Sequence, residues 1–347
     1  MPRSFKVFDV ELASQVLDWG QVEEVKEVLL ARATLFISEH AVTLANADGR
    51  FSPKNTKSMF YGRNMQLAKS LLSVDGTTLF DGFIKSIDVD HANRTVTITS
   101  QNSLTLPANS KVLLTTTGNP AAIIRTILES AGLAGYLDTG SFLGAQGGSS
   151  GAGATIGVNY TATSNATALQ AIQDISALCS LSCFVQGGLI RLREFSPYQG
   201  SSSGIKYAVT STTAYDFGIL ADAPNNISNS VTVLYGASSS VTLSDPDAIK
   251  ANGGLAVLTT FATSTNLNLY LSDVASARYF GNLFLTRAAN LKQIGKFRAG
   301  VKLLDAHIGD RITVQADNWS TSPIAFEIIE VRRAIASDSV ELVCATL

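Results

Sequence analysis

Short runs in which apolar and polar residues alternate, each ended by a turn, are the feature that most constrains the fold of this chain. In "AVTLANADGRFSPKN", residues 41–55, Val42 and Leu44 alternate with threonine and alanine, and the run ends at Asp48-Gly49, a dipeptide suited to positive φ. This pattern predicts a strand with one buried face that leaves its sheet at a turn. The stretch places no acid, base, nucleophile or metal ligand in a recognisable arrangement, so we expect its role to be architectural.

The first hundred residues repeat this pattern and are mostly strand and turn. Val96 and Ile98 alternate with threonines, and "DHAN" supplies the turn to the preceding strand, which predicts a hairpin with one buried face. Residues 21–40 have helical spacing in their first half and strand composition at "ATLFIS", so their type stays open. Ser58 is expected at the surface.

The middle region, residues 105–205, carries two amphipathic helical patterns and is predicted to be α+β. Asn119 and Pro120 are typical of a helix start, and Gly132 is typical of a helix end. The second helical pattern leads into two strands joined across Gln186-Gly187-Gly188.

The segment 140–157 is rich in glycine and serine and is predicted to be a flexible surface loop. Its Gly151-Ala152-Gly153 has neither the preceding strand nor the following helix N-terminus that a phosphate-binding loop requires. A nucleotide site is therefore not assigned to it.

The carboxyl-terminal region, residues 206–347, returns to strand patterns around a helical segment near 272–292, for which Ser272 is the expected cap. Gly309-Asp310 begins a strand whose Ile312 and Val314 face one way, and Ser337-Asp338 separates the last two strands. The fold class is therefore predicted to be mainly β (α+β). Two small β-barrel-like domains, residues 1–104 and 206–347, flank the α+β insert.

Composition and charge exclude several function classes. The formal net charge of −2 lacks the basic footprint of a protein that grips nucleic acid through phosphates. The cysteines Cys179, Cys183 and Cys344 are spaced unlike a zinc site and are expected to be buried apolar residues.

No catalytic, cofactor-binding or metal-binding residue is assigned. The three histidines, His40, His91 and His307, have no nucleophile in a recognisable turn near them. Asp305 and Asp310 beside His307 are interpreted as turn formers, and the adjacent Glu23 and Glu24 are expected on a solvated face.

The amino-terminal residues lack the apolar core of a signal peptide, and no later run approaches the ~18 apolar residues of a membrane span. We therefore expect a chain that is cytoplasmic when made and has no stable membrane insertion.

Five phrases in a fixed order carry a resemblance to a known family. They are "VTLANADGRFSP", "LFDGFIKSIDV", "NNISNSVTVLYG", "SDVASARYFG" and "HIGDRITV". In this order they resemble the baseplate hub or tail-tip hub proteins of tailed bacteriophages and related gene transfer agents. The motif positions that match are Asn46, Asp48, Gly49, Gly82, Asn229, Tyr235, Gly236, Tyr279, Gly281, Gly309 and Asp310. The resemblance implies that these are fold positions and not catalytic ones, and that the Asp48-Gly49 turn closes a strand pair of a tube domain.

The resemblance also implies a function. A hub of this family is a structural virion protein, a homotrimer in which two tube-like β-domains per subunit match a sixfold tail tube to a threefold tip. It lines the channel through which the genome leaves during ejection, so DNA passes without specific binding. The implied partners are a distal tail or tube protein above and tip, fibre or spike proteins below. The implied location is the virion, with assembly in the host cytoplasm.

Two other functions stay open. A β-rich receptor-binding or carbohydrate-binding tail protein would also be neutral and rich in serine and threonine. A peptidoglycan hydrolase is third, because it requires a carboxylate pair or a zinc site that the sequence does not display.

Overall fold

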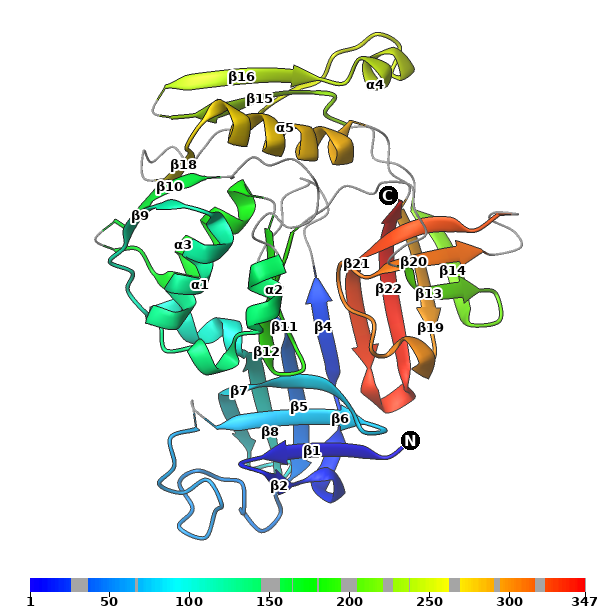
Figure 1. Cartoon of the computed structure of the whole chain (residues 1–347). Coiled ribbons are helices and arrows are strands. Elements are labelled where there is room, and N and C mark those ends of the chain that lie inside the picture. The colour runs from blue at the N-terminus through cyan, green and yellow to red at the C-terminus, as the bar shows by residue number, and fades with distance from the viewer. Residues whose placement is uncertain are drawn as a thin grey trace.

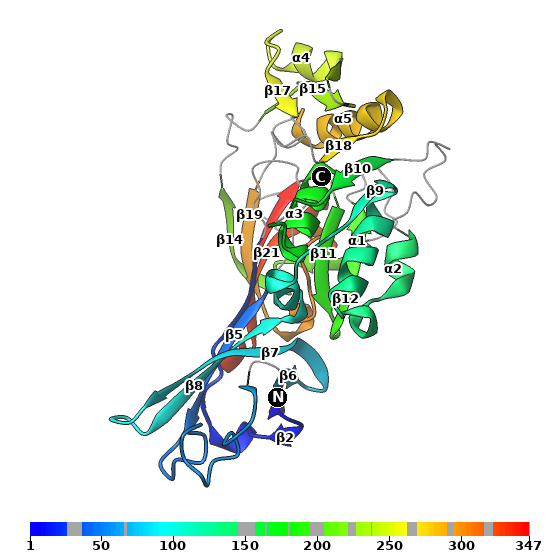
Figure 2. The same cartoon turned by 90° about the vertical axis from the view of Figure 1, so that its left-hand side faces the viewer.

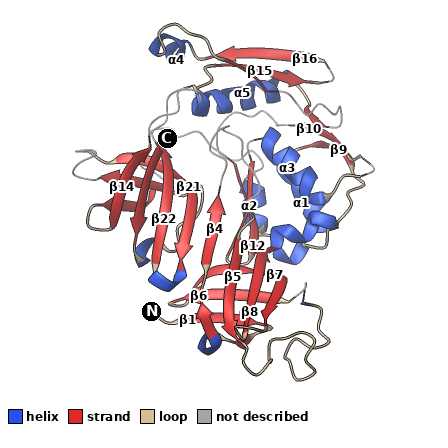
Figure 3. Cartoon of the chain, turned by 180° about the vertical axis from the view of Figure 1, so that it is seen from behind, coloured by secondary structure: helices blue, strands red, loops and turns tan. Residues whose placement is uncertain are grey.

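The computed structural model describes residues 1–25, 37–65, 68–144, 157–163, 165–179, 181–194, 205–220, 227–236, 238–261, 269–289, 294–315 and 322–346. Two β-rich lobes lie side by side, and a helix-containing region adjoins them (Figure 1). The helices gather in that third region, and strands dominate elsewhere (Figure 3). The mainly β fold class is confirmed.

The first β-region is a curled antiparallel sheet around its own apolar core. Its elements are β1 (Arg3–Val7), β2 (Val10–Glu11), η1 (Ala13–Gln15), β3 (Val16–Asp18), β4 (Gln21–Val25), β5 (Glu39–Ala45), β6 (Lys69–Val74), β7 (Thr77–Asp90) and β8 (Thr95–Asn102). Val96 and Ile98 of β8 are buried between exposed or half-buried threonines, and β8 pairs with β7 across the predicted turn. The predicted hairpin is confirmed.

The second β-region is built from strands at both ends of residues 205–346. Its elements are β13 (Ile205–Thr210), β14 (Ala214–Leu220), β19 (Ile294–Ala299), η6 (Val301–Leu303), β20 (Arg311–Gln315), β21 (Ile324–Ala334), η7 (Ile335–Ser337) and β22 (Ser339–Thr346). Ile312 and Val314 of β20 are buried, and Asp338, with φ of 50°, makes the turn between β21 and β22. Both predictions for this region are confirmed.

Strand β4 joins the two β-regions into one sheet. It pairs with β5 of the first region on one side and with β21 of the second on the other, both antiparallel. The sheet order is β14-β19-β22-β21-β4-β5-β8-β7-β6-β1-β2. Residues 21–25 are therefore strand, while residues 26–36 of the ambiguous segment lie outside the described residues.

The third region combines the insert with a later segment of the chain. Its first part contains η3 (Ser103–Asn109), β9 (Thr115–Gly118), α1 (Pro120–Ser130), η4 (Ala134–Tyr136), α2 (Thr139–Gly144), β10 (Val158–Thr161), α3 (Ala168–Leu178), β11 (Leu181–Gln186) and β12 (Leu189–Glu194). Its second part contains β15 (Ser230–Tyr235), β16 (Ser239–Ser244), α4 (Pro246–Ala251), β17 (Leu258–Phe261), β18 (Leu269–Leu271) and α5 (Val274–Ala288).

These two parts share one apolar core, although the sequence analysis groups the second part with residues 206–347. Strand β18 pairs antiparallel with β10, and Val231 and Val233 are buried in the same cluster as Ile124 of α1 and Ile172 of α3. The physical reason is that β15 and α5 each have an apolar face that must be buried, and both faces pack against apolar residues of the insert.

The helix boundaries confirm one predicted cap and correct another. The Asn119 side chain accepts a hydrogen bond from the Ala121 N–H at 2.9 Å, and Pro120 is the first residue of α1. Helix α5 is capped by Asp273, which accepts from the Ser276 N–H at 2.8 Å, and not by Ser272. Both residue types cap helices, so the pattern alone did not separate these neighbours.

The glycine-rich segment 140–157 is not a loop throughout. Residues up to Gly144 belong to helix α2, which lies against β12. Residues 145–156, including Gly151-Ala152-Gly153, lie outside the described residues.

The Asp48-Gly49 turn is confirmed, but it does not close a strand pair. Gly49 has a φ of +71°, as predicted. The chain then runs to β6, which pairs with β1 and β7 and not with β5. Ser58 in this loop is buried, where its hydroxyl donates to the Arg50 carbonyl at 2.8 Å and accepts from the Phe60 N–H at 3.1 Å. Its expected surface position is wrong because the loop folds back on the sheet.

We predict that Gly49→Val destabilises the first β-region by about 1–2 kcal/mol, because a β-branched residue is strained in the left-handed region. A Cβ atom there would also lie 2.7 Å from Asn55 Nδ2. The matched control is Gly118→Val in β9, where a Cβ meets nothing within 4 Å and φ is ordinary. Urea unfolding of both variants measures the difference, and equal free energies of unfolding would contradict the prediction.

Candidate functional site

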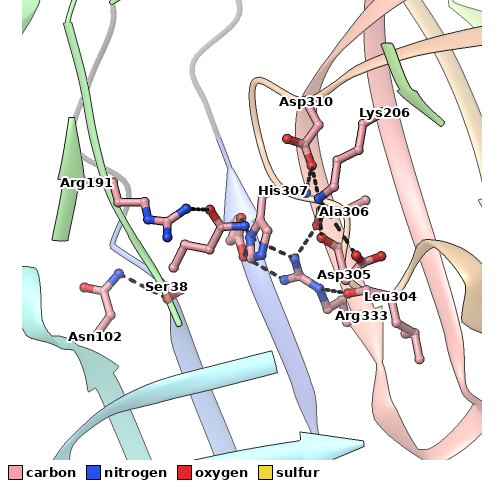
Figure 4. A network of polar contacts seen from close by, with 12 residues as sticks. Ser38, Asn102, Arg191, Lys206, Leu304, Asp305, Ala306, His307, Asp310 and Arg333 are labelled. Carbon is pink, nitrogen blue, oxygen red and sulfur yellow. Dashed lines mark hydrogen bonds and ion pairs between the residues drawn. The ribbon is translucent and has the colours of Figure 1, made fainter. Parts of the chain in front are cut away.

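A buried arginine occupies the seam where β4 meets β21. The Arg333 side chain is 0% exposed and lies on the core face of β21. Its Nε donates to the Leu304 carbonyl at 2.7 Å, its Nη2 donates to the Ala306 carbonyl, and its Nη1 donates to Glu24 Oε1 at 2.7 Å (Figure 4). One guanidinium thus binds strand β4 and the turn 304–306 at the same time.

Glu24 is the partner charge, and its position corrects the solvated face expected for it. The side chain is 12% exposed, and His307 Nδ1 lies 3.2 Å from its Oε1. Burial by itself raises the pKa of Glu24, but the Arg333 guanidinium and the His307 ring outweigh burial and lower the pKa from 4.5 to about 2. The carboxylate therefore stays ionised at neutral pH. Residues two apart in a strand lie on the same face, and Val22, two residues before Glu24, is fully buried. An apolar residue at position 22 was therefore the sequence signal that Glu24 points into the core.

Asp310 organises the other side of the seam as a turn former, as predicted. Its Oδ2 accepts from the His307 N–H at 2.9 Å and from Lys206 Nζ at 3.0 Å (Figure 4). Arg193 of the insert strand β12 lies 3.7 Å from Oδ1. A Cβ atom on Gly309, whose φ is +80°, would lie 2.7 Å from Arg193 Nη1. Glycine at this position therefore allows the insert to approach the second β-region.

The hairpin β11–β12 also reaches the first β-region. Its turn residue Gly188, with φ of +78°, lies so close to β7 that a Cβ atom would be 2.4 Å from Asp81 Oδ2. Phe184 of β11 is buried in an apolar cluster that both β-regions share, since Leu72 and Phe80 of the first and Phe326 of the second belong to it. The hairpin thus contacts both β-regions and braces the seam.

The remaining motif positions lie in separate places. Asn46 is buried beside the Asp48-Gly49 turn, where its side chain accepts from the Phe51 N–H at 2.9 Å. A Cβ atom on Gly82 would lie 2.3 Å from the Gln101 carbonyl oxygen of the neighbouring strand. These residues shape the first β-region.

The motif positions in the later segment belong to the third region. Asn229 is fully buried. Its side chain donates to the Leu255 carbonyl at 3.0 Å and accepts from the Val257 N–H at 2.7 Å. Tyr235 ends β15, and Gly236, with φ of +55°, turns the chain after it. On α5, Gly281 allows close packing, because a Cβ atom would lie 2.5 Å from Leu243 Cδ1, and Tyr279 packs edge-on against Phe280. Of all the matched positions, Gly309 and Asp310 lie at the seam.

The opposite face of the same strands carries paired charges, and we call it the charged face. It comprises Glu23, Asp216, Lys296, Arg298, Glu330, Arg332 and Glu341. Arg332, the neighbour of Arg333, is 46% exposed there and lies 3.9 Å from both Glu23 and Glu341. Strand alternation therefore places one arginine in the core and the next in solvent.

Within the described ranges, no three His, Cys, Asp or Glu side chains lie together in a grouping that could hold a metal ion. The cysteines Cys179, Cys183 and Cys344 are all buried and unpaired by disulfides, as expected. Among the helices of those same ranges, none has the length and apolar character to cross a membrane.

We predict that Arg333→Met costs about 3–5 kcal/mol of stability, because it leaves Glu24 as an uncompensated buried charge. Arg332→Met is the matched control on the exposed face, and it should cost about 1 kcal/mol or less. Adding Glu24→Gln to Arg333→Met should restore part of the loss. Urea unfolding measures all four chains, and equal losses at positions 332 and 333 would refute the assignment.

Acid should weaken the seam in a defined range. The pKa of Glu24 is lower in the folded chain, so its stabilisation is complete above pH 4.5 and is lost as pH falls toward 2. We expect wild type to lose on the order of 3 kcal/mol more than Glu24→Gln over that range, from about 1.4 kcal/mol per pKa unit. Unfolding free energies at stepped pH values test this, and parallel curves for the two proteins would contradict it.

Solved tail proteins share this fold along the whole chain. A tail protein from Neisseria meningitidis is 14% identical, with a TM-score of 0.62 and coverage of 99% of this chain and 97% of that one. The 43 kDa tail protein of prophage MuSo2 from Shewanella oneidensis is 8% identical, with a TM-score of 0.60 and coverage of 99% and 98%. The prophage tail protein gp18 from Listeria monocytogenes is 11% identical, with a TM-score of 0.55 and coverage of 99% and 94%. No family model matches the chain, and no curated protein matches its sequence. The chain therefore has the fold found in these tail proteins.

Proposed function

We propose that the chain is a structural component of a phage-type tail and, within that tail, the trimeric hub of the tip or baseplate. The observation that carries this proposal is the union of two β-regions, edge to edge, in one sheet of a single subunit. The likeness to three tail proteins along the whole chain supports the tail assignment.

The seam provides the geometry for such a hub. Three copies of a subunit with two β-regions supply six β-regions, which matches a threefold tip to a sixfold tube. A closed ring requires heterologous contacts between neighbours. In the proposed ring, residues 1–104 of one chain meet residues 206–347 of the next, so that the contact between subunits resembles the one that β4 and β21 make within a subunit.

The two sides of the sheet suit different places in the ring. Strands β14, β19, β21, β5 and β8 form one side of the molecule, and helices α1 and α2 lie on the other (Figure 2). The insert then lies outside the ring, and the charged face lines the channel through which DNA leaves. The hub performs no catalysis itself, and it contacts the tube protein above and tip, fibre or spike proteins below in the virion.

We expect each purified particle to contain three copies of this chain. Quantitative mass spectrometry of a known number of particles measures the copy number. Cross-linking of particles that mix isotopically light and heavy subunits should join residues 1–104 of one subunit to residues 206–347 of another. A copy number of one or six, or cross-links confined to single subunits, would overturn the hub and favour the receptor-binding alternative.

A further inference from the structure

On the charged face, three cations surround one carboxylate. Lys296 Nζ lies 2.7 Å from Glu341 Oε1, and Arg298 Nε lies 3.3 Å from Glu341 Oε2. Arg332 Nη1 lies 3.9 Å from Oε1 on the other side. Glu341 is 14% exposed, whereas all three cations are more than 40% exposed. The carboxylate therefore lies beneath the cations, and solvent reaches the cations first.

Hydrogen bonds and charge keep Glu341 ionised. The hydrogen bond from Lys296 is the largest cause that lowers its pKa, and Arg298 adds a further hydrogen bond and charge. An ionised carboxylate in contact with several cations lowers their attraction for any other anion, because each cation already has a charged acceptor.

The outer sides of the cations also face carboxylates. Asp216 Oδ2 lies 3.6 Å from Arg298, and Glu23 and Glu330 flank Arg332. Four carboxylates therefore face three cations over a surface hollow of about 520 Å³, whose lining includes Arg298, Arg332 and Glu341. A phosphate that enters the hollow meets no cation that lacks a carboxylate partner.

We propose that Glu341 masks these cations from duplex DNA, so that the charged face passes a phosphate backbone without holding it. This inference rests on the proposed function, which places the charged face along the channel. Removing Glu341 takes away the carboxylate that all three cations share, while Asp216 stays beside Arg298 and Glu23 and Glu330 stay beside Arg332. Lys296 is the cation that changes most, because its partner at 2.7 Å is lost. One added phosphate contact would give log affinity against log salt an added slope of roughly −0.9.

The test measures the affinity of the full chain for a labelled duplex of about 30 base pairs. Fluorescence anisotropy reports binding, and the titration is repeated at salt concentrations from about 50 to 200 mM. We expect Glu341→Gln to bind at least about tenfold more tightly than wild type, with that added salt slope. A second variant, Asp216→Asn combined with Glu23→Gln, removes flanking carboxylates that are 65% and 49% exposed and leaves Glu341 in place. This double variant should also bind DNA more tightly than wild type. Because both positions are exposed, the substitutions should not disturb folding.

The matched control is Glu129→Gln. Its carboxylate pairs with Arg125 at 2.7 Å on helix α1, away from the charged face, and the change in net charge equals that of Glu341→Gln. Circular dichroism verifies that each variant is folded. The masking inference is overturned if folded Glu341→Gln and the double variant bind no better than wild type. It is also overturned if Glu129→Gln gains as much, or if wild type already binds as tightly as Glu341→Gln and with the same salt slope. The copy number of particles tests the hub independently, so the two failures are distinguishable.

Discussion

The contact between Arg333 and Glu24 is the interaction on which the arrangement of the two β-regions depends. A guanidinium removed from water is costly unless its donors are bonded, and here two carbonyls and a carboxylate receive them. Those acceptors come from different parts of the chain, because β4 supplies the carboxylate and the turn 304–306 supplies the carbonyls. One side chain therefore ties the two β-regions together at the point where β4 and β21 pair, within an apolar cluster to which both regions contribute.

The seam makes the two β-regions a single mechanical unit. Strand β4 has neighbours from both regions, so neither sheet has an open edge at that point. The hairpin β11–β12 adds a second contact, because Gly188 approaches Asp81 on one side and Arg193 approaches Asp310 on the other. A force applied to one region would therefore reach the other through both backbone pairing and the insert.

Local pattern predicted much of this fold, and distant pairing did not follow from it. Val96, Ile98, Ile312 and Val314 were placed correctly because the alternation that buries them is written within a few residues. Arg333 was missed because its partner Glu24 lies 309 residues away, and no pattern in the neighbouring sequence predicts a buried cation. The placement of β15 and α5 with the insert was missed for the same reason, since β18 pairs with a strand more than a hundred residues earlier. Ser272 and Asp273 show the opposite limit, in which two adjacent residues both fit the local rule.

The separation between Glu24 and Arg333 has a consequence for synthesis of the chain. At about 5–20 residues per second, Arg333 leaves the ribosome roughly 15–60 s after Glu24. Throughout that interval β4 has no β21 to pair with, and Glu24 remains hydrated. We expect the nascent first β-region to expose a strand edge to chaperones and to neighbouring nascent chains until β21 has been synthesised. Strands β21 and β22 therefore complete a sheet whose first strands were synthesised well before them.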